Sequence, residues 1–400
     1  MDKMEAIPSD YDFGSMHAAM QRHVDTNVLA GVSSAVLVGR DLVDVNCAGW
    51  ANKEEKIPLG VDHIFRVYSN TKLVTACAAL LLFEEGHFEL DDPIERFIPQ
   101  LSNRQVLRRG ARTLRDVEPA RGSITFRQLL SHSSGLSYGL LDPGTMMFEA
   151  YNERKVLDPS ATLSDMMDRL ADLPLVFDPG EGWEYSVASD VMARCIEVVS
   201  GQAFDAFIQS RILDPLGMVD TGFAVPESKR HRLAALYAGA SLTDPMRPGL
   251  KRIDDASPQD YGFFPPARWL SGGGGLVSTL HDMAALVRSL RPGGATILKP
   301  ETIALMMTNQ LPEGAWIKFP WVGELWGKGF GLAGAVTVAP STRTPHAAPG
   351  DFTWGGIAGT QWWISPKINC AVVLMTQRLP ALLHPYILEI IHLVRRAVTR

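Results

Sequence analysis

A run of apolar side chains from Leu73 to Phe83 constrains the fold of this 400-residue chain more than any other feature. Wound as a helix, these residues leave almost no polar face, and a helix that is apolar all round is buried. The rest of the chain must therefore surround it. The sequence predicts a large core built around a helix that follows Ser69 and ends near Gly86.

Ser69-Asn70-Thr71-Lys72 opens this helix and is the only Ser-x-x-Lys in the chain. A lysine in apolar surroundings is costly, and burial favours its neutral, proton-accepting form. Residues three apart on a helix share a face, so we expect Lys72 to reach the hydroxyl of Ser69. This predicts a serine nucleophile beside its base. The alternative is that Ser69 caps the helix and Lys72 extends to solvent.

Composition excludes several classes of protein. The net charge is −6 and charges of both signs are mixed along the chain, so nucleic acid is not an expected partner. No apolar run is long enough for a membrane span and the first residues have no apolar leader, which predicts a cytoplasmic protein. The histidines lack zinc-binding spacing, so no metal is expected. Four separated cysteines are expected to be buried hydrophobes: Cys47, Cys77, Cys195 and Cys370.

Strand patterns lie near both ends of the chain, and helical patterns fill the middle. This predicts an α/β (α+β) fold with one antiparallel sheet made from N- and C-terminal segments, flanked by helices. A mostly helical region, approximately 75–325, would be inserted into a single domain spanning 1–400. The Pro/Gly-rich stretch 237–268 is predicted to be an active-site wall or lid. Strands are expected at 33–39, 42–49, 329–339, 352–356, 360–364 and 370–376, and helices at 15–26, 126–131, 161–173, 188–200, 203–213, 280–290 and over the last 20 residues.

Three elements stand in order: Ser69-Asn70-Thr71-Lys72, Tyr185-Ser186-Val187 and Trp354-Gly355-Gly356. The ordered set resembles the serine β-lactamase and penicillin-binding-protein superfamily, near the class C enzymes, and within it the family VIII carboxylesterases. The resemblance covers roughly residues 15 to 395. Further phrases agree with it, among them Leu129-Leu130-Ser131-His132-Ser133-Ser134-Gly135, Pro215-Leu216-Gly217-Met218 and Ser271-Gly272-Gly273-Gly274-Gly275.

The resemblance implies a β-lactamase/transpeptidase-like fold and a cofactor-free serine hydrolase. Ser69 would be the acyl-accepting nucleophile, Lys72 its general base and Tyr185 a proton relay. The oxyanion hole would use the backbone N–H groups of Ser69 and Ile357. Substrate would lie against Trp354, Gly355 and Gly356.

Departures from the family pattern indicate the substrate. Trp354 stands where the lactamase pattern has a lysine, and Val187 stands where it has an asparagine. Losing a cation beside a substrate carboxylate forfeits roughly 1–4 kcal/mol, or about 5- to 1000-fold. We therefore expect neutral short-chain or aryl esters as the small-molecule substrates. The alternatives are β-lactamase or D-alanyl peptidase activity, acyl transfer to an alcohol or amine, and a non-catalytic penicillin-recognition protein. The sequence does not indicate the oligomeric state.

Three patterns suggest other chemistry but lack its context. Gly135-Leu136-Ser137-Tyr138-Gly139 matches a nucleophile elbow without the required strand before the serine, so we expect no nucleophile at Ser137 and a structural role for His132. Gly329–Gly334 matches GxGxxG, but a strand-like segment follows where a dinucleotide site needs a helix. The glycines 272–275 precede no Gly-Lys-Ser/Thr, so we expect a close-packed turn beside the site.

Overall fold

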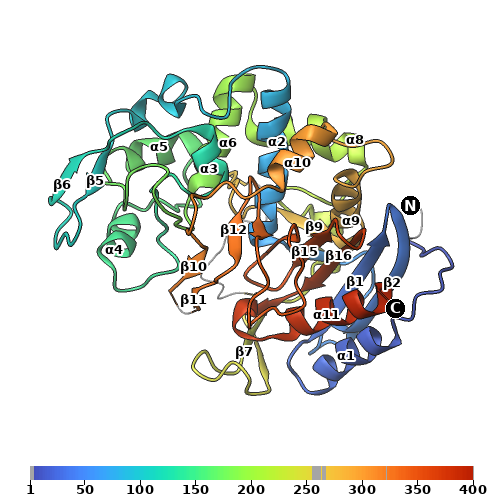
Figure 1. Cartoon of the computed structure of the whole chain (residues 1–400). Helices are drawn as coiled ribbons and strands as arrows, with labels where there is room; N and C mark the ends of the chain where they lie inside the picture. The colour runs from blue at the N-terminus through green and yellow to red at the C-terminus, as the bar shows by residue number, and fades with distance from the viewer. Residues whose placement is uncertain (1–3, 255–262, 264–266, 321, 400) are drawn as a thin grey trace.

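The computed structural model describes residues 4–254, 263, 267–320 and 322–399. Its centre is an eight-stranded sheet in the order β12-β13-β14-β15-β16-β1-β2-β3, with every pair antiparallel (Figure 1). The C-terminal strands therefore pair with the N-terminal ones, as predicted. The strands are β1 (Gly31–Val38), β2 (Asp41–Asn52), β3 (Ile57–Pro58), β12 (Lys328–Phe330), β13 (Ala335–Thr337), β14 (Phe352–Gly355), β15 (Gln361–Ser365) and β16 (Cys370–Thr376).

The join between the two ends of the chain is the β1–β16 pair, in which Val36 lies opposite Val372. Both faces of β1 are buried. Ala35 and Leu37 belong to the larger core, while Val32 and Val36 belong to a second cluster on the other face. Successive side chains of a strand point to opposite faces, so this strand reads as a continuous apolar run.

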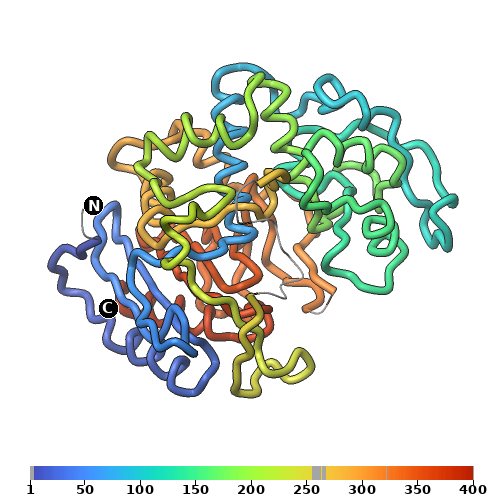
Figure 2. The backbone as a smooth tube through the Cα atoms, turned by 180° about the vertical axis from the view of Figure 1, so that it is seen from behind, coloured from blue at the N-terminus to red at the C-terminus, as the bar shows by residue number. Residues whose placement is uncertain are grey.

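Helices cover the two faces of the sheet unequally (Figures 1 and 2). The terminal helices α1 and α11 cover one face, and the inserted helical region with α2 at its centre packs on the other. The predicted helices are present, and α4, α8 and α10 are additional to them. The helices are α1 (Gly14–Asp25), α2 (Thr71–Glu84), α3 (Phe126–Leu130), α4 (Met146–Glu153), α5 (Leu163–Ala171), α6 (Ala188–Ser200), α7 (Phe204–Ile208), α8 (Asp214–Leu216), α9 (Leu280–Ser289), α10 (Pro300–Met306) and α11 (Tyr386–Val398).

The predicted strand 329–339 is wrong in one respect, because it folds back on itself as the β12–β13 hairpin. The amide of Gly331 donates to the carbonyl of Gly334 at 2.8 Å and closes the turn. A Cβ at Gly331 would lie 2.2 Å from the carbonyl oxygen of Met306, so the glycine motif serves close packing.

Short strands outside the main sheet pair in small sheets of two or three strands. They are β4 (Ile64–Arg66) with β9 (Val277–Thr279), β5 (Gln105–Leu107) with β6 (Val117–Pro119), β10 (Lys318–Phe319) with β11 (Gly323–Glu324), and β7 (Tyr237–Gly239) with β8 (Leu250–Arg252) and β17 (Arg378–Leu379). The expected wall or lid at 237–268 thus begins as a hairpin. Its residues 255–262 and 264–266 lie outside the described part of the chain.

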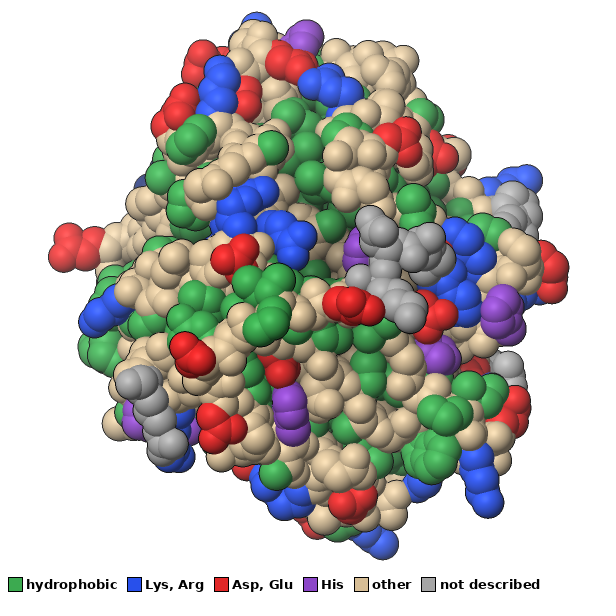
Figure 3. All heavy atoms as spheres, turned by 90° about the vertical axis from the view of Figure 1, so that its right-hand side faces the viewer, with side chains coloured by type: hydrophobic (Ala, Val, Ile, Leu, Met, Phe, Trp, Pro, Cys, Tyr) green, Lys and Arg blue, Asp and Glu red, His purple; other side chains and the backbone are tan. Residues whose placement is uncertain are grey.

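The surface carries charges of both signs. On the face shown in Figure 3, acidic and basic side chains are interspersed. Within the described residues, no helix combines the length and apolar character that crossing a membrane requires.

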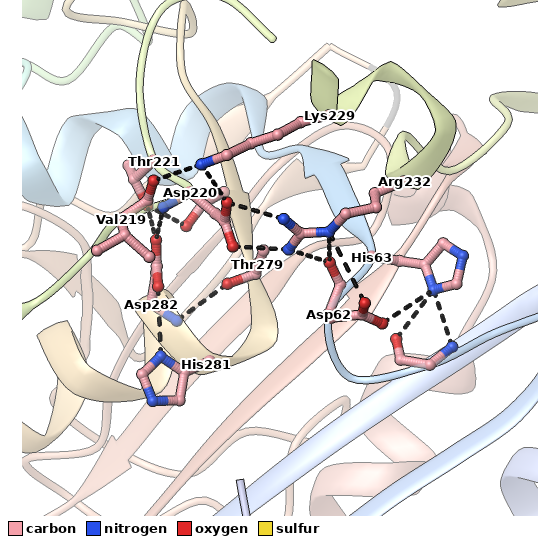
Figure 4. A network of polar contacts seen from close by, with 12 residues as sticks. Asp62, His63, Val219, Asp220, Thr221, Lys229, Arg232, Thr279, His281 and Asp282 are labelled. Atoms are coloured by element: carbon pink, nitrogen blue, oxygen red, sulfur yellow. Dashed lines mark hydrogen bonds and ion pairs between the residues drawn. The ribbon is translucent and has the colours of Figure 1, made fainter. Parts of the chain in front are cut away.

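A polar network ties the chain after α8 to the start of α9 (Figure 4). The buried carboxylate of Asp220 accepts hydrogen bonds from Arg232 at 2.6 Å and 3.0 Å and forms an ion pair with Lys229 at 2.7 Å. Asp282 accepts from the amide of Asp220 and the hydroxyl of Thr221, both at 2.8 Å. Burial alone would raise the pKa of Asp220, but the hydrogen bonds from Arg232 and Lys229 outweigh it and lower that pKa.

Asp220→Asn is expected to lower the free energy of unfolding by about 2 to 4 kcal/mol, because it leaves two cations without their buried anion. Urea denaturation followed by circular dichroism measures this. Since the pKa of Asp220 is depressed in the folded state, its contribution is present above the unfolded pKa of about 4 and is lost as the pH falls through the folded value. The control is Glu227→Gln, which breaks an exposed ion pair with Arg230 nearby and should change stability by less than about 0.5 kcal/mol. An equal effect of both variants would contradict the role of the network.

Candidate active site

Ser69 lies in a tight turn, Tyr68–Asn70, that runs directly into α2. Tyr68 has a φ of 42°, in the left-handed region that a bulky side chain rarely adopts. Backbone of this kind is found where a side chain must be presented to a site. The side chains of Tyr68 and Asn70 are buried, whereas Ser69 remains partly exposed.

Tyr185 makes the direct contact with Ser69. Its hydroxyl donates to Ser69 Oγ at 2.7 Å, from the extended segment that precedes α6. His132 holds this segment, because its Nδ1 accepts from the amide of Ser186 at 3.3 Å and its ring lies 4.9 Å from that of Tyr185. Burial, and secondarily the charge of Lys72, lower the pKa of His132 well below its ordinary value. His132 is therefore a neutral support for Tyr185, consistent with its expected structural role.

Lys72 is buried, with 3% of its surface exposed, at the start of α2. Its Nζ donates to the carbonyl of Gly273 at 2.6 Å and lies 4.7 Å from the centre of the Tyr185 ring. The hydrogen bonds among the described residues do not include a direct one from Lys72 to Ser69. The amine of Lys72 is hydrogen-bonded to the carbonyl of Gly273, so the expected contact with the Ser69 hydroxyl stays a prediction.

The end of β14 lies against the Ser69 turn. A Cβ at Gly356 would lie 2.5 Å from the carbonyl oxygen of Val67, so only glycine allows this approach. Thr360 Oγ1 donates to the same carbonyl at 3.1 Å. Ile357 follows directly, and its backbone N–H donates to no recorded acceptor among the described residues. It is available to a ligand, as an oxyanion-hole donor must be.

Trp354 belongs to an aromatic wall, defined here as Trp183, Tyr185, Phe319, Phe330 and Trp354. Its ring lies 5.3 Å from Tyr185 and 5.0 Å from Phe330. Its indole Nε1 donates to the hydroxyl of Tyr185 at 3.3 Å, a contact that the sequence motifs did not predict. Only the dual character of indole, an apolar body with one N–H donor, could have suggested it.

Glu184 is a second titratable group beside Tyr185. Burial raises the pKa of its carboxyl to about 7, and the charge of Lys318 partly opposes this. The hydroxyl of Ser137 points to this carboxyl at 3.4 Å. Ser137 is itself buried and lies in an irregular segment between α3 and α4, not at the strand-to-helix junction of a nucleophile elbow.

Comparisons with known proteins identify the family to which the chain belongs. A family model described as Beta-lactamase matches residues 16–393. The Mycobacterium tuberculosis protein Rv1367c (strain ATCC 25618 / H37Rv) is 32% identical over 378 residues, which cover 91% of this chain and 90% of that protein. Esterase EstB of Burkholderia gladioli is 30% identical over 359 residues, or 87% and 86% of the two chains. The solved structure of EstCE1, a hydrolase with promiscuous acyltransferase activity, has a TM-score of 0.79 at 27% identity and covers 96% of this chain and 97% of its own.

The chain belongs to the beta-lactamase family. Its fold is the β-lactamase/transpeptidase-like fold, with the sheet and helices arranged as the sequence predicted. Within that fold it is a serine hydrolase whose relatives include named esterases.

Proposed function

We propose that this enzyme hydrolyses uncharged short-chain or aryl carboxylic esters through an acyl-enzyme on Ser69. The observation that carries the proposal is the 2.7 Å hydrogen bond from Tyr185 to Ser69 Oγ, with the buried amine of Lys72 against the Tyr185 ring. A serine nucleophile needs a partner that can take its proton; Tyr185 contacts this hydroxyl directly, and Lys72 lies against the Tyr185 ring. EstB and EstCE1, an esterase and a hydrolase by name, support the reaction class.

In the proposed reaction, Lys72 acts as general base and Tyr185 relays the proton. Ser69 Oγ attacks the ester carbonyl as its proton passes to this pair. The carbonyl oxygen becomes an oxyanion held by the backbone N–H groups of Ser69 and Ile357. The C–O bond to the alcohol then breaks, and the alkoxide leaves with the proton from Tyr185. A water molecule, deprotonated by the same pair, attacks the acyl-enzyme and releases the carboxylic acid.

The aromatic wall supports the preference for uncharged esters. Trp354 replaces the lysine of the lactamase pattern, and its indole N–H is already used by Tyr185. The partly exposed rings of Tyr185 and Phe319, backed by the buried rings of the wall, offer an apolar surface to an acyl or aryl group, and position 354 has no cation for a substrate carboxylate. We therefore place β-lactam and D-alanyl peptide substrates second.

Acyl transfer is a variant of the same mechanism, in which an alcohol or amine takes the acyl group instead of water. EstCE1, a hydrolase with promiscuous acyltransferase activity, is a reason to test acyl transfer here. Adding methanol to an ester assay and measuring the ratio of methyl ester to free acid separates transfer from hydrolysis.

The substrate class is tested by comparing kcat/KM for p-nitrophenyl butyrate with that for a chromogenic cephalosporin bearing a carboxylate. The expected ratio is about 100-fold or more in favour of the ester, since the missing cation forfeits a few kcal/mol for the anionic substrate. Denatured enzyme quenched during turnover should carry a butyryl group on Ser69 by mass spectrometry. Equal turnover of the two substrates would instead favour a β-lactamase.

A further inference from the structure

The mechanism so far does not use Asp190, a fully buried carboxyl in the first turn of α6. Its Oδ1 accepts from the hydroxyl of Ser271 at 2.5 Å and from the amide of Gly273 at 3.2 Å. Its Oδ2 is buried and has no hydrogen-bond partner among the described residues. A buried carboxylate with one unpaired oxygen is costly, so a role beyond packing is expected.

Gly273 connects this carboxyl to the active site. Its N–H donates to Asp190 and its carbonyl accepts from Lys72 Nζ at 2.6 Å. The neighbouring carbonyl of Gly272 accepts from the hydroxyl of Thr75 at 2.7 Å, which anchors the same loop to α2. The loop 271–275 thus bridges α2 and α6 directly behind the catalytic amine.

The glycines of this loop are required by the bridge. A Cβ at Gly272 would lie 2.4 Å from the carbonyl oxygen of Ser189, and one at Gly273 would lie 2.7 Å from Asp190 Oδ2. Real Cβ atoms do not approach other atoms this closely. Any other residue would therefore push the loop away from α6 and break the hydrogen bonds that link Asp190 to Lys72 through Gly273. The glycine run 272–275, which resembles a phosphate-binding loop, therefore serves the close packing of this loop against α6.

We propose that Asp190 is a positioning residue that holds Lys72 through Gly273 and, by its negative charge, favours the ammonium form of that amine. The two side chains are linked through the backbone of Gly273, so Asp190 acts on Lys72 across that link and by its charge. This rests on the proposed function only for its effect on turnover. The hydrogen-bonded link from Asp190 through Gly273 to Lys72 exists whether or not the substrate is an ester.

The other groups that face Lys72 do not account for such a coupling. Tyr138 and Tyr185 present ring faces, at 5.9 Å and 4.7 Å from Nζ to the ring centres. His132 lines a small cavity beside Lys72 and is neutral, because burial lowers its pKa. The same cavity is lined by apolar groups from α3 and the β12–β13 hairpin, including Leu129, Phe330 and Leu332. Burial raises the pKa of Asp190, and the charge of Lys72 opposes that rise.

The direct test is the titration of Lys72 itself, followed by NMR in protein labelled with ¹³C at lysine Cε and assigned with Lys72→Met. In Asp190→Asn, Lys72 is expected to lose its proton at a pH at least one unit lower than in the wild type. Asparagine retains an oxygen for Ser271 and Gly273 but removes the charge. An unchanged titration midpoint would overturn the proposal and leave Asp190 a structural residue.

Two further variants keep the test decisive. Ser271→Ala removes the donor that stabilises the Asp190 carboxylate, so a smaller shift in the same direction is expected even if Asp190→Asn does not fold. Thr75→Val removes the neutral anchor of the same loop without changing any charge, and it should leave the midpoint where it is. A shift in Thr75→Val as large as that in Asp190→Asn would contradict the proposal, because geometry alone would then explain it.

Turnover gives an independent readout. The acidic limb of the kcat/KM profile for p-nitrophenyl butyrate should move to lower pH in Asp190→Asn by the same amount as the Lys72 midpoint. Glu184→Gln removes the other carboxyl that titrates near neutrality, and it should not move the Lys72 midpoint. If the midpoint shifts while the wild type turns over no ester, the role of Asp190 stands and the proposed function fails.

Discussion

Ser69→Ala is expected to reduce ester turnover by about 10⁴-fold or more, because nothing else at the site can form the acyl-enzyme. The hydroxyl that is lost is the one that accepts from Tyr185 at 2.7 Å. Initial rates of p-nitrophenyl butyrate hydrolysis measure the loss, and mass spectrometry should show that the variant carries no butyryl group.

The matched control for this experiment is Ser137→Ala. Ser137 is the serine of the elbow-like motif, and its hydroxyl faces Glu184 instead of Ser69. We expect turnover by this variant within a few-fold of the wild type. An inactive Ser137→Ala together with an active Ser69→Ala would reject the proposed mechanism.

Lys72→Met is expected to reduce kcat by about 10³-fold, within the range for loss of a general base. Methionine keeps the apolar stem of the side chain but has no amine, so Tyr185 alone would have to take the proton. Stopped-flow measurement of nitrophenolate release should show slow acylation and no burst.

Lys328→Met controls for the removal of a partly buried amine elsewhere. Lys328 lies on β12, donates to Thr337 Oγ1 at 2.5 Å and has a pKa that burial lowers. Its loss should affect stability more than kcat. Equal loss of kcat in the two variants would show that the effect at Lys72 is structural.

The parts of the fold that follow from local pattern were predictable. The strands near both ends of the chain either alternate apolar and polar residues or are apolar throughout, and the central helix is apolar on every side. Burial of these apolar side chains therefore determines where both kinds of element lie. Thr125 caps α3, because its hydroxyl accepts from the amide of Gln128. The hairpin at 329–339 was not separated into two strands, because the turn glycines and the strand residues share one apolar run.

The contacts that define the site could not be predicted in the same way. Lys72 meets Gly273, and Trp354 meets Tyr185, only after segments far apart in the sequence have packed. The ordered motifs indicate which residues converge, but not which atom each one bonds. The free amide of Ile357 depends likewise on how the end of β14 meets the Ser69 turn.

The tryptophans illustrate the same limit, because their burial is decided by tertiary packing. Trp183 and Trp354 form the aromatic wall, whereas Trp362 is in the core and Trp363 packs beneath Arg395 on the opposite face of the sheet. Trp326 is 55% exposed. Trp321 lies outside the described residues. Residue type alone does not distinguish these environments.

The pairing of β1 with β16 also sets when the molecule can assemble during synthesis. The ribosome adds roughly 5–20 residues per second, so β1 waits roughly 20–70 s for its partner strand. Throughout that interval the apolar surface of α2 and one edge of β1 have no final partner. The nascent chain is therefore expected to depend on chaperones, and a chain that stops before β16 is expected to aggregate. Because α1 and α11 pack together on the same face of the sheet (Figure 1), a permuted gene that joins the two ends of the chain by a linker and translates β16 before β1 would shorten this exposure.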